Sequence, residues 1–288
     1  MYYPYFRGKQ FDLLALRALL EQNLLSKKIQ PIIEPVKHTT ALQKLFEIVQ
    51  KQHYPIYLIE NPQVGDFNTE TGNLTLQSFS AKKALIVDQP LETIEKNADL
   101  WIVNKPSAAL TSDWSNNQKK VLVPPEFRLL NTVQGEKVLS VDHFTRLPKP
   151  SFYQEKTDEF FSNDHLIYKQ RGFTGFSDFS IDSRIYYEKG YPSPLLSLHI
   201  VYFDQKTLRI HHFLSPEDLP SQKEKFLVLM QEVKTWQKFL AKEKMIAGLT
   251  ILFDYAEKEK FPGLGVMRKA AVMHHMEIMS RYLEEKDG

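Results

Sequence analysis

The sequence contains no cysteine among its 288 residues. Disulfide bonds, thiolate zinc sites and cysteine nucleophiles are therefore excluded throughout the chain. No apolar run reaches the roughly 18 residues that a membrane helix requires, and the opening MYYPYFRGKQ lacks the basic and then apolar layout of a signal peptide. We therefore expect a cytoplasmic protein that makes no use of a membrane.

An excess of charge of one sign is also missing. Lysine and arginine number 37 against 35 aspartates and glutamates, which gives a formal net charge of +2. This balance excludes a basic nucleic-acid arm or an acidic tail as a dominant feature, although it leaves room for a local basic patch. We therefore expect any association with nucleic acid to occur through a partner.

Reaction signatures are absent as well. The chain has only 11 glycines, and no glycine-rich phosphate turn follows any apolar run. Walker A, G-x-S-x-G, H-E-x-x-H and protein-kinase patterns do not occur. Motifs alone therefore name no reaction.

The first half of the chain alternates between short apolar runs and amphipathic segments. Eight runs can form strands, at 2–8, 29–36, 55–61, 83–89, 99–104, 119–125, 137–144 and 172–181. Strands that are apolar on both faces need cover on both faces, which is typical of parallel strands joined by crossover helices. The sequence therefore predicts an α/β fold with a (β/α)8 TIM-barrel-like core over residues 1–182. A doubly wound open sheet is the rival architecture.

The pattern changes after residue 182. The expected elements are a β-hairpin and helical segments, at 195–203 paired with 208–215, 221–244, 248–260 and 263–285. Alternation and turn chemistry support the hairpin, and Ser221 with Glu224 has the spacing of a capping box. No linker-like stretch precedes these elements. We therefore expect residues 183–288 to pack as an elaboration on the same domain as the barrel.

Polar side chains recur where the predicted strands end. The carboxyl ends of parallel strands converge on one side of the fold, and ligands bind there. The polar residues at or just beyond these ends are Arg7, Lys9, Glu34, Glu60, Asn61, Asp88, Asn104, Glu126, Asp142 and Asp178. Such a ring can hold a divalent ion or a polar ligand, or exchange protons with a substrate. Alternatively, each residue only marks the point where a buried strand meets water.

Four members of this ring are expected to line one pocket, namely Arg7, Glu34, Glu60 and Asp142. Glu34 stands out because a carboxylate followed by proline inside an apolar strand needs a partner when it is buried. If the protein is an enzyme, the three carboxylates would serve as metal ligands or as a base in the hydrolysis of a phosphodiester. A divalent metal ion is the one cofactor that such a ring suits.

Two histidines in the hairpin form a second candidate site. If the turn is centred on Gln205 and Lys206, His199 lies directly opposite His212 on one face of the hairpin. Two imidazoles about 5 Å apart across neighbouring strands can share a metal ion. The alternative is an aromatic cross-strand pair with one imidazole hydrogen-bonded.

Six parts of the chain together carry a family resemblance. They are MYYPYFRGKQFDLLALR, IQPIIEPVK, the DHF and R of 142–146 with EFFS (159–162), GFTGFSDFSI, LHIVYF with LRIHHFLS, and GLGVMRKAAVMHHMEI. Together they resemble a bacterial family related to the "beta protein" of satellite phages. Members are encoded beside a small partner that resembles a restriction-type nuclease, and the phage relative protects its host from a neighbouring lethal product. The resemblance implies a barrel-like α/β fold and a role in phage defence or toxin neutralisation, without an active site.

Three functions stay open. The chain can bind and neutralise or regulate a nuclease-like neighbour, act as a metal-assisted phosphodiesterase, or sense a ligand at the barrel mouth. The missing reaction signature favours binding, whereas the ring of strand-end carboxylates favours chemistry. The C-terminal helices are expected to supply apolar surface for a partner or for a second copy of the chain, through Trp236, Phe239, Met267, Met273 and Met276. Packing on the barrel is the alternative role of these side chains.

Overall fold

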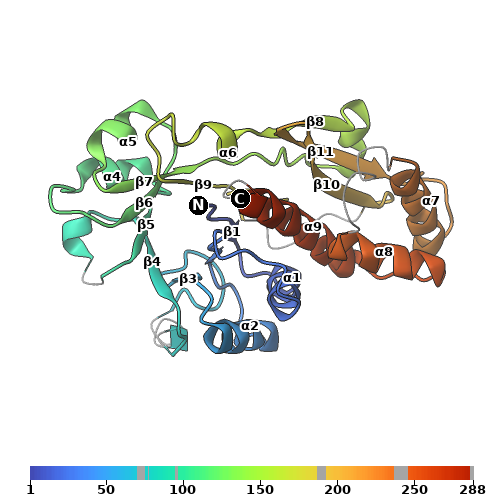
Figure 1. Ribbon diagram of the computed structural model, residues 1–288, viewed down its shortest axis with the longest axis horizontal. Coiled ribbons are helices and arrows are strands. Elements are labelled where there is room, and N and C mark those ends of the chain that lie inside the picture. Colours follow the sequence, from blue (N-terminus) through green and yellow to red (C-terminus); the bar gives the residue numbers. More distant parts are fainter. Residues whose placement is uncertain (70–74, 77, 95–96, 187–192, 237–245, 286–288) are drawn as a thin grey trace. The chain divides into compact units, whose positions relative to one another are not determined.

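The computed structural model describes residues 1–69, 75–76, 78–94, 97–186, 193–236 and 246–285 (Figure 1). Contacts divide the chain into two compact units. Unit 1 contains Met1–Leu13, Lys27–Asp142 and Asp164–Phe179, and unit 2 contains Leu14–Ser26, His143–Asn163 and Ser180–Gly288. Among the described residues, no helix is both long enough and apolar enough to cross a membrane.

Unit 1 is built on eight parallel strands that form a nearly closed barrel (Figure 1). In order around the barrel they are β1 (Tyr5–Phe6), β2 (Ile32–Ile33), β3 (Tyr57–Ile59), β4 (Lys82–Ile86), β5 (Leu100–Ile102), β6 (Lys120–Val123), β7 (Glu136–Ser140) and β9 (Gly175–Ser177). A parallel bridge between Tyr2 and Phe176 joins the first and last strands. The backbone N–H of Tyr5 also donates to the carbonyl of Asp178 at 2.8 Å. The predicted TIM-barrel-like core is confirmed, and the open-sheet rival is wrong.

The connections between the strands are only partly helical. They contain α2 (Thr40–Gln52), η1 (Leu91–Thr93), α4 (Pro106–Thr111), α5 (Phe127–Thr132) and α6 (Asp164–Ile167). The helix α1 (Gln10–Glu21) begins in unit 1, and its later turns belong to unit 2. The side chain of Thr39 caps α2 by accepting a hydrogen bond from the N–H of Leu42 at 3.2 Å.

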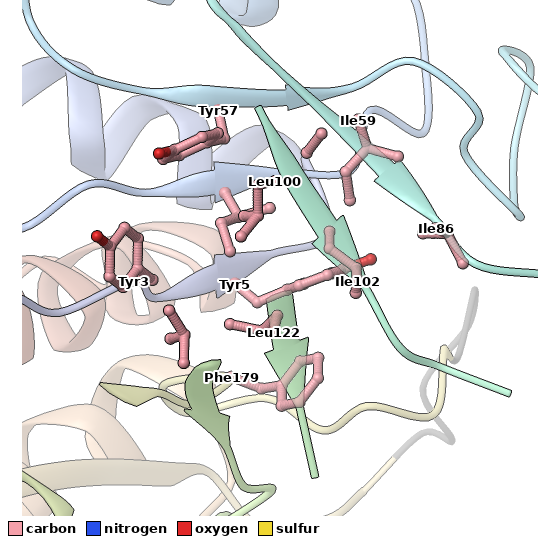
Figure 2. Packing of buried hydrophobic residues seen from close by; sticks show 12 residues of the cluster. Tyr3, Tyr5, Tyr57, Ile59, Ile86, Leu100, Ile102, Leu122 and Phe179 are labelled. Atoms are coloured by element: carbon pink, nitrogen blue, oxygen red, sulfur yellow. The ribbon is translucent and has the colours of Figure 1, made fainter. Parts of the chain in front are cut away.

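Apolar side chains fill the interior of the barrel (Figure 2). The buried cluster consists of Tyr3, Tyr5, Ile32, Tyr57, Ile59, Ala84, Ile86, Leu100, Ile102, Leu122, Val138 and Phe179. Where one strand and its flanking residues contribute two members, the two are separated by two positions, because successive side chains of a strand point to opposite faces. This alternation determines which strand-end residues share the interior face and which lie on the outer face.

Unit 2 contains an antiparallel sheet with the strand order β10-β11-β8. Its strands are β8 (Asp158–Ser162), β10 (Ser197–Asp204) and β11 (Thr207–Leu214). The last pair of the hairpin is Asp204 with Thr207, so the turn falls on Gln205 and Lys206 as predicted. The expected pairing of His199 with His212 is therefore confirmed.

Helices accompany this sheet in unit 2. They are η2 (Pro150–Glu155), α7 (Gln222–Thr235), α8 (Ala247–Glu257) and α9 (Leu264–Glu285). The side chain of Ser221 caps α7 by accepting from the N–H of Glu224 at 3.1 Å, which confirms the predicted helix start. Residues 237–245, over which we expected this helix to continue, lie outside the described residues.

The two units divide the chain differently from the expected boundary at residue 182. Barrel unit 1 ends at Phe179 and excludes Leu14–Ser26 and His143–Asn163. The physical reason is visible in β8, which pairs with β11 of the hairpin and not with a barrel strand: Glu159 is opposite Ile210, and Asp158 is opposite His211. The C-terminal elements therefore form a compact unit together with segments from earlier in the chain.

Most of the side chains that we expected to offer partner-binding surface are core residues of unit 2. Met267, Met273 and Met276 are buried within α9. The ring of Trp236 packs edge-on against Tyr202 at a centroid distance of 4.7 Å. Phe239 lies outside the described residues. The three methionines are therefore not available to a partner.

Candidate functional site: the carboxyl end of the barrel

A ring of polar side chains follows the apolar core at the carboxyl ends of the barrel strands. On five strands the residue two positions beyond a core residue is polar, and on β7 it is the residue four positions beyond. We call the six residues the mouth ring: Arg7, Glu34, Asn61, Asp88, Asn104 and Asp142. Because strand side chains alternate, the spacing assigns the ring to the same interior face as the core.

Glu34 is the centre of the hydrogen-bond network in this ring. Its side chain is fully buried, and its Oε2 accepts a hydrogen bond from the Tyr5 hydroxyl at 2.7 Å and forms an ion pair with the Arg7 guanidinium. The other oxygen, Oε1, accepts from the backbone N–H of Gln63 at 2.9 Å. Both carboxylate oxygens are therefore occupied, by two donors from the β1 segment and by one donor from the loop after β3.

Tyr5 takes part in this network as a proton donor. Its burial and the neighbouring charge of Glu34 raise the pKa of the Tyr5 hydroxyl well above its ordinary value. The Asn104 side chain hydrogen-bonds the same hydroxyl. The network thus extends from β1 and β2 to the end of β5.

The backbone around the ion pair requires a glycine at one position. Gly8 has a φ of +56°, a conformation that glycine adopts without strain. A Cβ at this position would lie 2.8 Å from the carbonyl oxygen of Glu34. The turn after β1 can therefore approach β2 closely only because residue 8 has no side chain, and this approach accompanies the contact between Arg7 and Glu34.

Gln63 extends the network to β3 and β4. Its side-chain amide donates to Asp88 Oδ2 at 3.1 Å and to the carbonyl of Asn61 at 2.9 Å. The side chain of Asn61 both donates to the carbonyl of Ile86 and accepts from its N–H, each at 2.8 Å, which prolongs the ladder between the two strands. Sequence reasoning missed Gln63, because it lies in a loop where strand periodicity no longer applies.

Two expected ring residues lie on the outer face of the barrel wall. Glu60 follows the core residue Ile59 by one position and forms an ion pair with Lys83 at 3.2 Å. Asp178 precedes the core residue Phe179 and accepts a hydrogen bond from the hydroxyl of Tyr2 at 2.7 Å. A shift of one residue moves a strand side chain to the other face. Glu60 therefore does not line a common pocket with Arg7 and Glu34, and Asp178 is not part of the mouth.

The remaining expected residues lie at the rim of the barrel. Lys9 is half-buried, and its carbonyl accepts the N–H of Asp12 at 3.0 Å where α1 begins. Glu126 is exposed and precedes α5 as its N-cap residue. Asp142 is half-buried and shares the face of Val138 on β7. The described contacts thus connect Arg7 and Glu34 with Tyr5, Asn104, Gln63 and Asp88. The spacing along β7 assigns Asp142 to the same end of the barrel.

The histidine pair of unit 2 forms a hydrogen bond and not a metal site. The two Nδ1 atoms of His199 and His212 are 2.7 Å apart, whereas two nitrogens bound to one tetrahedral zinc at about 2.0–2.1 Å lie more than about 3 Å apart. His212 Nε2 faces a carboxylate oxygen of Glu159 at 3.4 Å and carries a proton there, so His199 Nδ1 is the donor within the pair. Within the described ranges, no group of three or more histidine and acidic side chains could hold a metal ion.

The environment keeps this pair neutral. Burial lowers the pKa of His199 to about 3, and the neighbouring His212 and the charge of Arg268 add to this effect. The pKa of His212 is also lowered by burial, although Glu159 opposes that shift. The ring of Tyr153 lies 4.4 Å from the His212 ring, which makes the surroundings aromatic. The expected aromatic cross-strand arrangement therefore describes the site.

A second polar cluster on the same sheet was not expected from the sequence. Asp158 accepts hydrogen bonds from Arg209 Nε at 2.7 Å, from the Tyr202 hydroxyl at 2.8 Å and from His211 Nδ1 at 3.0 Å. Burial acts to raise the pKa of Asp158, but these three hydrogen bonds outweigh it and lower the pKa. The cluster joins all three strands and is a structural network, because every contact runs between members of the sheet.

Comparison of the chain with protein-family models, with curated proteins and with solved structures finds no match. The resemblance to the satellite-phage family stays a prediction for that reason.

Proposed function

We propose that the protein acts by binding a second protein, and that the network around Glu34 stabilises the barrel wall. The observation that carries this proposal is the full use of the Glu34 carboxylate by Tyr5, Arg7 and the backbone of Gln63. A general base needs an oxygen within hydrogen-bonding reach of the substrate proton, and a metal ligand needs an oxygen that faces the ion. Glu34 offers neither, so the residue best placed for chemistry is better suited to structure.

The partner that we propose is the nuclease-like protein suggested by the family resemblance. Binding would neutralise or regulate the toxicity of that protein. The barrel would then serve as a scaffold, in which the buried ion pair and its hydrogen bonds connect β1, β2 and the loop after β3. A second copy of this chain is the alternative occupant of the same surface.

Two exposed aromatic side chains of unit 2 supply a surface of suitable chemistry. Phe152 in η2 is 47% exposed, and Phe160 in β8 is 53% exposed. The cores of protein interfaces are enriched in aromatic residues, whereas water contact with a phenyl ring is unfavourable. β8 is also the last strand in the order of its sheet, and its next residue, Phe161, is fully buried. We propose that apolar side chains of the partner cover these exposed rings.

Co-expression with the product of the adjacent gene tests the proposal. We expect a complex that co-elutes in size-exclusion chromatography and loses toxicity. The double variant F152A/F160A should fold but lose both the complex and the neutralisation. A matched control is F127A, which removes a 77% exposed phenylalanine from α5 of unit 1 and should keep both. Equal behaviour of the two variants would contradict the proposed surface.

A ligand-sensing role is the second candidate function, and the carboxylates of the mouth ring favour it. The charge of Arg7 is neutralised by Glu34, and Asp88 and Asp142 add two further carboxylates at the same end of the barrel. Such a ring suits a ligand rich in amine or hydroxyl groups. A D88N/D142N variant that folds and binds the partner, yet no longer protects the cell, would support this role over simple binding.

A further inference from the structure

The amino-terminal ends of the barrel strands carry an unusual concentration of basic side chains. Lysine pairs lead into three alternate strands, at 27–28 before β2, 82–83 in β4 and 119–120 at β6. Lys137 lies at the start of β7, and Lys169 and Arg171 lie in the turn before β9. We call these nine residues the basic floor. All of them belong to unit 1.

Strand pairing brings these residues to one end of the barrel. Lys120 pairs in register with Glu136 of the neighbouring strand β7. The carbonyl of Lys137 accepts the backbone N–H of Thr174 at 2.9 Å, which joins β7 to the turn of residues 169–171. On the other side, the carbonyl of Lys28 accepts the N–H of Tyr2 at 2.9 Å. The basic side chains therefore surround the same rim of a parallel barrel.

Few acidic side chains balance this charge. Within the described segments that lead into the strands, the acidic residues beside the floor are Asp99 and Glu136. Glu136 forms an ion pair with Lys120 at 3.1 Å, and the outer-face residue Glu60 pairs with Lys83 at 3.2 Å. Neighbouring strands are about 4.8 Å apart and the Debye length is about 8 Å, so the remaining charges reinforce one another. The floor is strongly positive although the whole chain has a net charge of only +2.

We propose that the basic floor binds the phosphate backbone of nucleic acid, so that this protein contacts nucleic acid directly and not only through a partner. Lysine side chains contact phosphates as point charges without reading base sequence, and we therefore expect sequence-independent binding. This inference does not rest on the proposed partner, because it uses residues of unit 1, whereas the proposed partner surface belongs to unit 2.

The composition of the floor favours nucleic acid over a membrane or a protein. A peripheral membrane surface inserts apolar side chains, and a protein interface needs an apolar core. The large hydrophobic side chains that are exposed in the described chain all lie outside the floor, at Phe127, Phe152, Phe160, Ile185, Val228 and Leu264. A surface with many lysines and no exposed apolar anchor matches a polyphosphate ligand.

Fluorescence anisotropy on the full-length chain with a labelled DNA duplex of arbitrary sequence tests this inference. If about four to six phosphates are neutralised, a plot of log K against log salt should have a slope of about −4 to −5. The variant K27Q/K119Q/K169Q/R171Q changes exposed residues of the floor and should reduce the slope by up to about 4 and the affinity at about 0.1 M salt by at least about 10-fold. Its melting temperature should equal that of the wild type.

A matched variant controls for net charge. K44Q/K105Q/K206Q/K258Q removes the same number of positive charges from exposed positions outside the floor and should keep the wild-type affinity. An equal loss in both variants, or no binding of the duplex at low salt, would overturn the inference. Binding of phosphatidylserine vesicles without binding of DNA would assign the floor to a membrane surface instead. Co-elution with the protein partner should be unchanged in the floor variant, which separates this test from that of the proposed function.

Discussion

Breaking the buried ion pair at the barrel mouth should destabilise unit 1 strongly. Glu34 is fully buried and Arg7 is 7% exposed, so either single replacement by methionine leaves an uncompensated charge in the barrel wall. Removing one partner of a buried pair costs about 3–5 kcal/mol, whereas replacing both partners costs less than the sum of the two single losses, because no charge is left uncompensated. The double replacement still removes the acceptor of the Tyr5 hydroxyl and of the Gln63 N–H. We therefore expect R7M and E34M each to lower the free energy of unfolding by about 4 kcal/mol, and R7M/E34M to lower it by about the same amount and not by twice as much.

Urea denaturation in a W236F background provides the assay. Trp236 belongs to unit 2, and the two remaining tryptophans, Trp101 and Trp114, belong to unit 1 and report its unfolding alone. The double-mutant cycle then gives a coupling free energy of about 4 kcal/mol between Arg7 and Glu34. Additive effects, or single losses below about 1 kcal/mol, would refute the argument, because they would mean that the pair is solvated like a surface salt bridge.

Three further predictions follow from the structure. First, acidification from about pH 8 to about pH 5 should destabilise unit 2 by about 4 kcal/mol, with about 2 kcal/mol from each of His199 and His274. Burial lowers their folded-state pKa values to about 3 and about 4, against an unfolded pKa of about 6.5, so their stabilising effect is present above pH 6.5 and lost as the pH falls. Melting curves of H199F should lose about half of this pH dependence, and those of H53N, which changes an exposed histidine, should keep all of it. Second, G8A should lower the free energy of unfolding, measured by chemical denaturation, by about 1–3 kcal/mol. Residue 8 has a positive φ, and the Cβ of an alanine there would lie 2.8 Å from the carbonyl oxygen of Glu34. An unchanged free energy of unfolding would show that the turn can relax. Third, Mg²⁺, Mn²⁺ or Zn²⁺ should leave the melting temperature unchanged, whereas an ion at 100 times its dissociation constant would stabilise the protein by about 2.7 kcal/mol and restore the metal-dependent hypothesis.

The barrel could be predicted from the sequence because its signal is local. Each strand is a short apolar run, and eight such runs in the correct order are enough to predict a parallel barrel. The register of the hairpin was predictable for the same reason, since the turn at Gln205 and Lys206 fixes every pair. The sheet to which β8 belongs was not predictable, because it depends on pairing with β11 about 50 residues later in the chain.

The sequence allowed the positions of the mouth-ring residues to be predicted to within one residue along each strand, but not the face on which each side chain lies. Apolar runs indicate where a strand ends, but the face of its last side chain depends on register, which separates Asn61 from Glu60 and Phe179 from Asp178. Gln63 lies beyond the periodic part of β3 and contacts Glu34 through its backbone, to which composition gives no clue. The position of His212 opposite His199 was correctly predicted, yet the choice between a metal and a hydrogen bond required the distance between the two Nδ1 atoms.

The central claim is that this protein functions by binding through unit 2, while the carboxylate network of the barrel mouth has a structural role. The most direct measurement is neutralisation of the co-expressed neighbouring protein by E34Q, by F152A/F160A and by the wild type at equal soluble amounts. We predict that E34Q neutralises as well as the wild type and that F152A/F160A fails to bind or neutralise. A folded E34Q protein that binds but no longer neutralises, together with an active F152A/F160A protein, would contradict the account.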